Sequence, residues 1–348
     1  MTIALESIPR VAPAEALAAA ELEYGIVGEI SPLPSERDQN YLISDAHGGK
    51  FVLKIANLHD AHELLDLQNK AMRHVGNRVA DCQVQRIVNS LRGSDITDIR
   101  DGQSGTLHRV RLLTWIEGDV LAKSHLRSPA LFESIGAALA RIDAALCDFS
   151  HPAMRRVLQW DLRHAGMARE SAGLLSRDRR SRIERLFSQW ESIDWTRLRH
   201  SVIHGDANDY NVIVAGGRMV GLLDFGDMVH SATVCELAIA LAYVMLDEQE
   251  PLKAATQVIR AYHRRYPLSD AEQQALFALI LSRLCMSVCY SAHNRARNPD
   301  DPYQVVTEAA AWDLIDKLER WSAEDAEALV RTACAAPGNA VSMRAWRN

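Results

Sequence analysis

The sequence predicts an α+β fold in two parts, a small antiparallel-sheet lobe over residues 1–117 and a larger, mostly helical lobe over residues 118–348. Before Gly118, short apolar runs alternate with glycine- and proline-rich turns, which is typical of β-hairpins. Beyond Gly118, apolar residues mostly recur at helical spacing. A chain of 348 residues is also long enough to bury the cores of two lobes.

The first lobe is expected to consist of strands around one central helix. Residues 13–24 are rich in Ala, Leu and Glu and predict a leading helix that ends at Gly25. Residues 61–75 carry apolar side chains at helical spacing and predict the central helix. The predicted strands are residues 26–30, 39–44, 50–55, 83–89 and 107–113, with turns at 32–34 and 47–49 and a polar, Gly-rich stretch at 92–105.

The second lobe is expected to be helical except around residues 201–223. The predicted helices are residues 129–147, 163–174, 178–191, 233–246, 251–265, 270–292, 303–321 and 323–335. Within the exception, a short apolar strand at 201–203 precedes a hairpin formed by 212–214 and 219–223 around a Gly-Gly turn. The strand and the hairpin are expected to lie next to each other, so that the polar motifs that follow them meet.

Composition narrows the class of protein. Hydrophobic residues make up 48% of the chain and charged residues 24%, as in an ordinary globular protein. The net charge of −6 argues against a nucleic-acid partner, which would favour a basic surface. The chain shows neither a run of about eighteen apolar residues nor an N-terminal leader pattern, and its six cysteines are scattered, so we expect no membrane partner and a cytoplasmic location.

Two polar motifs at the ends of the expected short strands carry the strongest functional signal. Residues 204–206 (His-Gly-Asp) are followed by Asn211, five positions beyond Asp206, and residues 224–226 (Asp-Phe-Gly) follow the hairpin. Phosphoryl transfer needs a carboxylate to orient the attacking hydroxyl and accept its proton, and hard oxygen ligands for Mg²⁺. Asp206 suits the catalytic role, and Asn211 and Asp224 suit the metal. Either motif alone is common loop chemistry, but their order and interval together predict a kinase.

With these motifs in residues 204–213 (HGDANDYNVI), and with residues 35–41 (SERDQNY) and 51–57 (FVLKIAN), the chain resembles the aminoglycoside phosphotransferase and choline kinase superfamily. Among its branches, these segments are most similar to hydroxylysine kinase. The resemblance implies a protein-kinase-like two-lobed fold, ATP or GTP as co-substrate, Mg²⁺ as cofactor and a small-molecule hydroxyl acceptor as partner.

Lys54 is the candidate cation for the α- and β-phosphates of the nucleotide. It lies in an apolar strand, where a lysine is costly to bury unless it is paired. The alternative is an edge-strand lysine that faces water. In kinases an acid on the following helix steadies this lysine. Glu63 and Asp66 are one helical turn apart and both can face the sheet; the resemblance favours Asp66, and Glu63 stays open.

Two further segments are candidates for nucleotide binding. The first hairpin has no Gly-x-Gly-x-x-Gly and instead offers the Ser35 hydroxyl and Arg37, which either adds positive charge or pairs with Asp38. The alternative is a polar hairpin tip that faces solvent. At the expected hinge between the lobes, backbone groups of Thr114 and Ile116 would hold the purine. Because backbone does the reading there, side-chain identity does not separate ATP from GTP.

Two residues are expected to support the catalytic loop. Glu236 opens a predicted helix, where an acid either stabilises the helix N-terminus or, as the resemblance implies, braces the loop. His204 is expected to orient the loop through a hydrogen bond and not to act as the base.

The acceptor site is predicted from charge. An ammonium group needs carboxylates, and the candidates are Asp209, just beyond the catalytic turn, and Asp161, next to Trp160 as a possible cation–π surface. A carboxylate group needs arginine, and the candidates are Arg163, Arg295 and Arg297.

A pocket with both signs of charge suits a hydroxy amino acid, so 5-hydroxy-L-lysine is the leading acceptor. The alternatives are homoserine, choline, ethanolamine or an aminoglycoside. A nucleotide-binding pseudokinase is the alternative outside the enzymes. It is disfavoured because Lys54, Asp206, Asn211 and Asp224 are all present.

Overall fold

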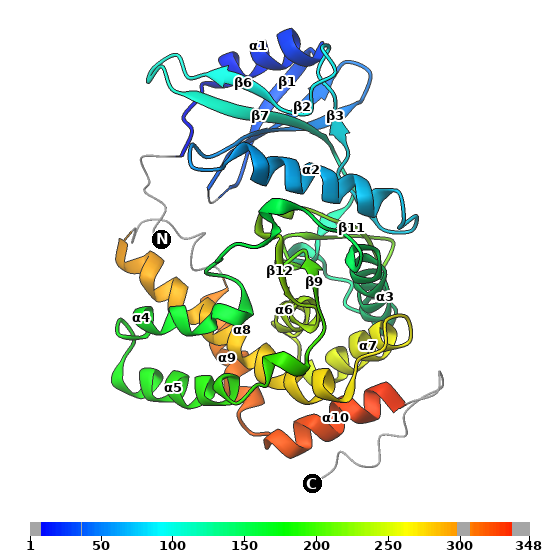
Figure 1. Ribbon diagram of the computed structural model, residues 1–348, viewed down its shortest axis with the longest axis vertical. Helices are drawn as coiled ribbons and strands as arrows, with labels where there is room; N and C mark the ends of the chain where they lie inside the picture. Colours follow the sequence, from blue (N-terminus) through cyan, green and yellow to red (C-terminus); the bar gives the residue numbers. More distant parts are fainter. Residues whose placement is uncertain (1–7, 36, 298–306, 336–348) are drawn as a thin grey trace.

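The computed structural model describes residues 8–35, 37–297 and 307–335, and its N-terminal part is a six-stranded antiparallel sheet (Figure 1). The strands run in the order β1-β2-β3-β7-β5, and β6 also pairs with β7. Their bounds are Gly28–Leu33 for β1, Gln39–Asp45 for β2, Lys50–Ile55 for β3, Ile87–Val88 for β5, Thr97–Arg100 for β6 and Leu107–Thr114 for β7. Lys54 is therefore on a central strand, opposite Asn40 and Arg111, and the edge-strand alternative is wrong.

Helix α1 (Pro13–Tyr24) covers one face of this sheet. Pro13 occupies its first position, where a missing N–H costs nothing, and the Glu15 carboxylate accepts the N–H of Ala12 just before it. Gly25 ends the helix, as predicted. Its φ of 69° lies in the left-handed region, which glycine adopts easily because it has no Cβ to clash. Its buried face packs on one apolar cluster with the sheet: Ala16, Ala20, Tyr24, Ile43, Leu53, Ile99 and Leu112.

Helix α2 (His62–Gly76) covers the opposite face and lies between the sheet and the helical part of the molecule (Figure 1). Its buried residues Leu67, Met72 and Val75 belong to the same apolar cluster as Leu113 of the sheet and Leu139 of the helical part. The two parts of the chain therefore share a core, and burial of α2 on both sides fixes how they face each other.

The C-terminal part is mostly helical, as predicted. Its helices are α3 (Pro129–Leu146), α4 (Arg169–Ala172), α5 (Arg177–Glu191), α6 (Val234–Val244), α7 (Pro251–His263), α8 (Asp270–Arg297), α9 (Glu308–Leu318) and α10 (Ala323–Ala335). Helices α3 and α7 pack closely at Gly136, where a Cβ would stand 2.1 Å from the carbonyl oxygen of Val258. Only glycine allows that approach.

Two small sheets lie beneath α2 and carry the polar motifs. One has the order β4-β11-β10-β8, and the other pairs β12 with β9. Their bounds are Gln83–Val84 for β4, Asp119–Val120 for β8, His200–Ile203 for β9, Val212–Ala215 for β10, Arg218–Leu222 for β11 and Val229–Ala232 for β12. Strand β9 thus pairs with β12 and not with the β10–β11 hairpin, so the two motifs are brought together by their loops and not by strand pairing.

Four predicted elements differ from the structure. The turn expected at 32–34 starts later, because Pro32 and Leu33 still pair with β2 as the end of β1. The expected strand 83–89 divides into β4, which pairs in parallel with β11, and β5, which stays in the first sheet. The polar stretch 92–105 contains β6, whose Ile99 points into the core although its neighbours are polar. The expected helix 163–174 begins as the 3₁₀ segment η4 (Leu162–Ala168), because His164 has a non-helical backbone. Of the expected helix 303–321, the first four residues lie outside the described residues.

Helix α8 is long and apolar enough to cross a membrane by length and composition, but 94% of that stretch is buried inside the protein. This is how the central helix of a folded domain behaves.

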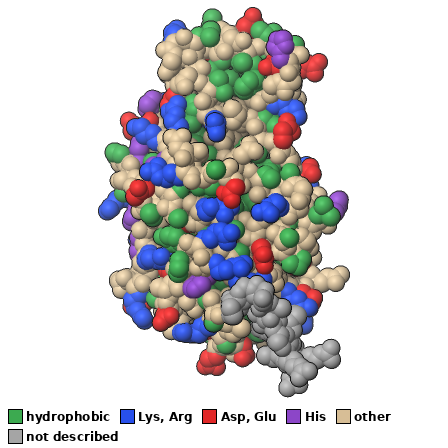
Figure 2. All heavy atoms as spheres, turned by 90° about the vertical axis from the view of Figure 1, so that its right-hand side faces the viewer, with side chains coloured by type: hydrophobic (Ala, Val, Ile, Leu, Met, Phe, Trp, Pro, Cys, Tyr) green, Lys and Arg blue, Asp and Glu red, His purple; other side chains and the backbone are tan. Residues whose placement is uncertain are grey.

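On the face in Figure 2, side chains of both charges are interspersed with hydrophobic ones, and lysines and arginines gather across its middle.

Candidate active site

The catalytic loop follows β9 and is held from three sides. The Gly205 N–H donates to Oε2 of Glu236, at 2.7 Å, and Glu236 is fully buried on α6. Nε2 of His204 lies 2.8 Å from the carbonyl oxygen of Leu223, just before the second motif. Gly205 has φ 81°, and a Cβ there would meet the carbonyl oxygen of Asp227 at 2.6 Å. Glu236 and His204 therefore make the loop contacts that the sequence led us to expect.

The Asp206 carboxylate accepts hydrogen bonds on both oxygens. Nδ2 of Asn208 and Nδ2 of Asn211 donate to Oδ2, at 3.0 and 2.9 Å. Nη2 of Arg283, from α8, donates to Oδ1 at 2.8 Å. Burial raises the pKa of Asp206; Arg283 lowers it, and the nearby Asp227 raises it further. A carboxylate held in this way has a fixed direction and a strengthened basicity, both of which suit a residue that accepts a proton.

Asp224 follows β11 with an unusual backbone, φ 54°, and its Oδ1 accepts the Gly226 N–H at 3.0 Å. Nζ of Lys54 reaches the same Oδ1 from the sheet at 3.2 Å. Burial alone would raise the pKa of Asp224, but Lys54 and Arg37 outweigh it and hold the pKa well below its usual range. Asp224 is therefore an anion at any physiological pH.

Asp224 and Asn211 fit a magnesium ion by donor chemistry. Both offer oxygen, and the Asn211 amide nitrogen donates to the backbone and side-chain oxygens of Asp206, which leaves its Oδ1 for a cation. Across the described residues, no group of three or more His, Cys, Asp or Glu side chains is placed to hold a metal. A magnesium ion here would depend on these two residues, on nucleotide phosphates and on water, which is how Mg²⁺ is usually bound.

The structure does not pair Lys54 with an acid of α2, so that prediction is wrong. The Asp66 carboxylate instead contacts Lys70 at 2.7 Å and His151 at 3.0 Å, and Glu63 is exposed. The positions of α2 that face the sheet interior hold Gln68 and Asn69, whose side chains accept from Arg111. The acids of α2 therefore lie outside the expected ion pair, and Lys54 is left to Asp224 and, at 3.9 Å, to Asp38.

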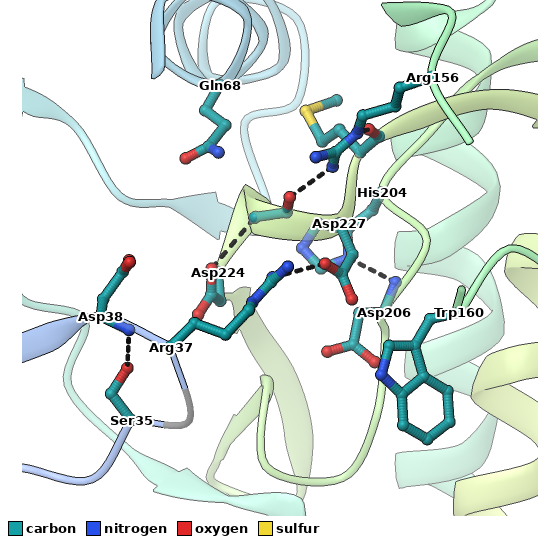
Figure 3. Close-up of polar contacts among 12 residues, drawn as sticks. Ser35, Arg37, Asp38, Gln68, Arg156, Trp160, His204, Asp206, Asp224 and Asp227 are labelled. Atoms are coloured by element: carbon teal, nitrogen blue, oxygen red, sulfur yellow. Dashed lines mark hydrogen bonds and ion pairs between the residues drawn. The ribbon is translucent and has the colours of Figure 1, made fainter. Parts of the chain in front are cut away.

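Arg37 crosses from the first hairpin to the second motif (Figure 3). Its Nη2 donates to Oδ1 of Asp227 at 2.6 Å, and the Asp227 charge raises the pKa of Arg37 further. It therefore pairs with Asp227, an acid that the sequence did not single out, and not with Asp38. Asp227 directly follows the Asp-Phe-Gly motif. This position is the only sequence signal that could have identified it.

Two more contacts fix these loops. Arg156 donates to the carbonyl oxygens of Gly226 and Met228, at 2.5 and 3.0 Å, and so holds the loop that carries Asp227 (Figure 3). The Ser35 hydroxyl accepts the Asp38 N–H at 3.2 Å, inside its own hairpin. Ser35 therefore shapes the hairpin tip in this structure, and its role toward phosphate stays a prediction.

At the hinge, the backbone groups of Thr114 are partly used within the protein. Its N–H donates to the carbonyl oxygen of Arg86 at 2.9 Å, and its carbonyl accepts from Nε2 of Gln85 at 3.3 Å. The N–H is therefore not free for a purine, whereas the carbonyl keeps a second lone pair, and its role toward a purine stays a prediction. The Ile116 side chain is buried and would be 2.9 Å from a Cβ at Gly221, and the role of its backbone stays a prediction.

On the acceptor side, Asp161 caps η4 instead of facing a ligand. Its Oδ1 accepts the Arg163 N–H at 3.0 Å and the Ser231 hydroxyl at 2.6 Å, and the residue is buried. Asp209 is also buried, but its Oδ1 has no hydrogen-bond partner. Burial, partly offset by a backbone N–H and by Arg127, raises the pKa of Asp209 to about 6. Of the two acids, Asp209 is the one with a buried oxygen that lacks a hydrogen-bond partner.

Among the candidate cations on the acceptor side, Arg295 already has a partner. Arg295 pairs with Glu308, roughly 18 Å beyond Arg283 along α8, so its role stays a prediction. Trp160 lies beside Asp206 (Figure 3), but one face of its ring is already covered by the Arg283 guanidinium, 4.4 Å from the ring centre. The sequence signal that could have found Arg283 is a single cation inside the most apolar part of a predicted helix.

The chain and its fold are similar to those of known phosphotransferases and kinases. A model of the phosphotransferase enzyme family matches residues 29–275. The hydroxylysine kinase of Mus musculus is 30% identical over 340 residues, covering 89% of this chain and 90% of that protein. Among solved structures, amicoumacin kinase in complex with AMP-PNP, Ca²⁺ and Ami has a TM-score of 0.68 at 16% identity, over 88% of this chain and 95% of its own. A microcompartment-associated aminopropanol kinase has a TM-score of 0.66 at 15% identity, over 92% and 94%.

Proposed function

Since this chain belongs to the phosphotransferase enzyme family, we propose that it transfers the γ-phosphoryl group of ATP or GTP to a hydroxyl of a small amino alcohol or hydroxy amino acid. The observation that carries the proposal is the position of Asp206, held on both oxygens beside Asn211 and Asp224. 5-Hydroxy-L-lysine is the leading acceptor, because similarity to hydroxylysine kinases extends over nine-tenths of the chain.

In the proposed reaction, Asp206 orients the acceptor hydroxyl and accepts its proton as the phosphoryl group moves. A bound Mg²⁺ would neutralise charge on the phosphates. Lys54 and Arg37 now pair with Asp224 and Asp227, and nucleotide phosphates would draw both cations away from these carboxylates. Most of the catalysis is then positioning and charge stabilisation, as expected for phosphoryl transfer.

For acceptor recognition, we propose Asp209 as the ligand of an ammonium group. It is the acid next to the catalytic loop that keeps an unpaired oxygen, and an arriving ammonium would pair with it. Arg295 would meet an acceptor carboxylate only after it leaves Glu308. Homoserine, choline, ethanolamine and aminoglycosides are the alternative acceptors, and a nucleotide-binding protein without turnover is the alternative outside the enzymes.

Two accompanying proposals concern organisation and location. We propose the lobe boundary between residues 117 and 118; the proposal is supported by the end of β7 at Thr114 and the start of β8 at Asp119. A cytoplasmic location is supported by the six cysteines, which are all free and so agree with a reducing compartment.

The test assays purified protein with each nucleotide, ATP or GTP, in combination with each acceptor: 5-hydroxy-L-lysine, homoserine, choline or kanamycin. Phosphorylated acceptor is detected by mass spectrometry, and D206N protein is the background. We expect Mg²⁺-dependent transfer with hydroxylysine as the best acceptor by kcat/KM. Transfer to another acceptor alone would keep the kinase and replace its substrate. Nucleotide binding without any transfer would favour the pseudokinase.

A further inference from the structure

The partner of Asp206 that its own loop does not supply is Arg283, at the centre of α8. The Arg283 side chain is 2% exposed, against 21% for Asp206. Around it on α8, Leu281, Leu284 and Cys285 are buried in the main apolar core. A fully buried arginine is therefore aimed at the one carboxylate to which the proposed reaction assigns the proton.

Arg283 contacts three other segments of the chain. Its Nη2 meets Oδ1 of Asp206 at 2.8 Å, and its Nη1 meets the carbonyl oxygen of Trp160 at 3.2 Å. The guanidinium lies over the Trp160 ring, 4.4 Å from its centre, and within 5.4 Å of the Tyr243 ring of α6. The planar fork is thus fixed in direction by two acceptors and two rings, which an ammonium on a flexible stem would not reproduce.

Stability alone is a weak reason for such an arrangement. Removing two charges from water is costly, and apolar side chains of similar volume often replace a buried ion pair without loss of stability. Nε of Arg283 also lacks a hydrogen-bond partner, which adds to the cost. The contact is better explained by what it does to Asp206.

The hydrogen-bond acceptor positions on the Asp206 carboxylate show what Arg283 does to this residue. An ionised carboxylate offers about four lone-pair positions, two on each oxygen. Asn208 and Asn211 occupy Oδ2, and Arg283 occupies one position on Oδ1. The remaining position is on Oδ1, the same oxygen that Arg283 holds. The direction of that position is therefore set by the arginine.

We propose that Arg283 is a positioning residue, which uses its fork between Asp206 and the Trp160 carbonyl to direct the free lone pair of Oδ1 at the acceptor hydroxyl. This inference rests on the proposed transfer to a hydroxyl. It makes α8, about 80 residues beyond the catalytic loop in sequence, part of the catalytic geometry.

The test compares Arg283→Gln and Arg283→Lys with the wild type. The glutamine cannot pair with Asp206 as a cation, and the single Nζ of lysine cannot span both acceptors. We expect kcat per folded molecule to fall about 100-fold in R283Q and at least about tenfold in R283K, as for a misplaced reacting group. Nucleotide KM, and nucleotide affinity measured directly by calorimetry, should stay within about threefold, because Arg283 does not reach the phosphate side.

Arg199→Gln is a matched control. Arg199 makes the same three kinds of contact, to the carboxylate of Glu272 at 2.6 Å, to the carbonyl oxygen of Pro267 at 2.8 Å and over the Tyr266 ring at 4.5 Å. R199Q should lower the melting temperature and leave kcat per folded molecule unchanged. A purely structural Arg283 would give the same result as this control.

Each outcome of these measurements either supports or overturns the inference about Arg283. A wild-type kcat per folded molecule in R283K and R283Q would overturn the inference and leave the kinase proposal intact. If R283Q does not fold, R283K decides: loss of kcat with wild-type nucleotide affinity supports positioning, whereas a wild-type kcat or failure to fold overturns it. Wild-type protein that transfers to no acceptor would overturn the proposed function and, with it, this inference.

Discussion

The two halves of the candidate site are built in opposite ways. On the nucleotide side, Lys54–Asp224 and Arg37–Asp227 join groups from the two parts of the chain, and Asp224 is 46% exposed. On the acceptor side, Asp206 and its partners all belong to the helical part, and Arg283 is almost fully buried. In the proposed reaction, phosphates displace the pairs of the first half, whereas the second half is fixed before any ligand binds. The difference suggests that nucleotide binding exchanges partners and that catalysis relies on preorganisation.

The largest effect is expected from D206N, which tests whether the fixed half does the chemistry. The amide keeps the shape of the carboxylate but cannot accept the hydroxyl proton, so kcat should fall by roughly 10²- to 10⁴-fold. Nucleotide KM should change little, because the phosphates are held in the other half. Steady-state kinetics check this. Unchanged kcat with a large rise in nucleotide KM would instead assign Asp206 to binding.

D224A tests the exchangeable half. Removing this carboxylate takes away one ligand of the proposed magnesium ion and leaves the buried Lys54 with Asp38 at 3.9 Å as its remaining acid. We expect kcat to fall by roughly 10²-fold or more at saturating Mg²⁺, with a circular dichroism spectrum like that of the wild type. A variant that keeps more than about a tenth of wild-type kcat would disprove a metal role for Asp224.

D209N asks whether the acceptor half contains the ammonium site. If Asp209 binds the ammonium, losing a charged hydrogen bond should cost roughly 1.5–3 kcal/mol, seen as a higher acceptor KM with nucleotide KM unchanged. Thermal stability at neutral pH should not fall, since burial disfavours the charge that the amide removes. D161N is the control: it weakens a cap and should lower stability without moving acceptor KM. An unchanged acceptor KM in D209N would remove Asp209 from the site.

The smallest effect is expected from the Arg37–Asp227 pair. If phosphate and Asp227 compete for Arg37, D227N should lower nucleotide KM and R37Q should raise it, each by about three- to fivefold, the range of a partly exposed ion pair. E117Q, which breaks the exposed pair with Lys50, should change neither value. If D227N and R37Q both raise nucleotide KM, the pair holds Arg37 in place for phosphate and is not exchanged.

The sequence predicted what local order encodes. The interval from Asp206 to Asn211 and the position of Asp224 after a hairpin follow from chain connectivity, so their proximity was foreseeable. The contacts of Glu236 and His204 with the loop were also anticipated. Most helices were found because their apolar spacing extends over several turns.

The errors concern contacts whose direction depends on tertiary packing. Asp66 was favoured by the family resemblance, but the rotation of α2 turns it toward His151. Asp161 has a suitable carboxylate, but this group caps η4 and accepts the Ser231 hydroxyl, and the Thr114 N–H donates to the Arg86 carbonyl. Arg283 lies far from the motif in sequence, and a helical period does not say which side chain meets the catalytic loop.

The β10–β11 hairpin has a mechanical consequence for the site. Its two edges are bound by β4, a short strand between α2 and β5 of the first part, and by β8, which follows the last strand of the first sheet. The Leu222–Val84 pair lies two residues before Asp224. If the first sheet shifts on the helical part, β4 and β8 would both pull on the hairpin. Asp224 would then travel with the sheet, while Asp206, anchored through Arg283 to α8, stays with the helices.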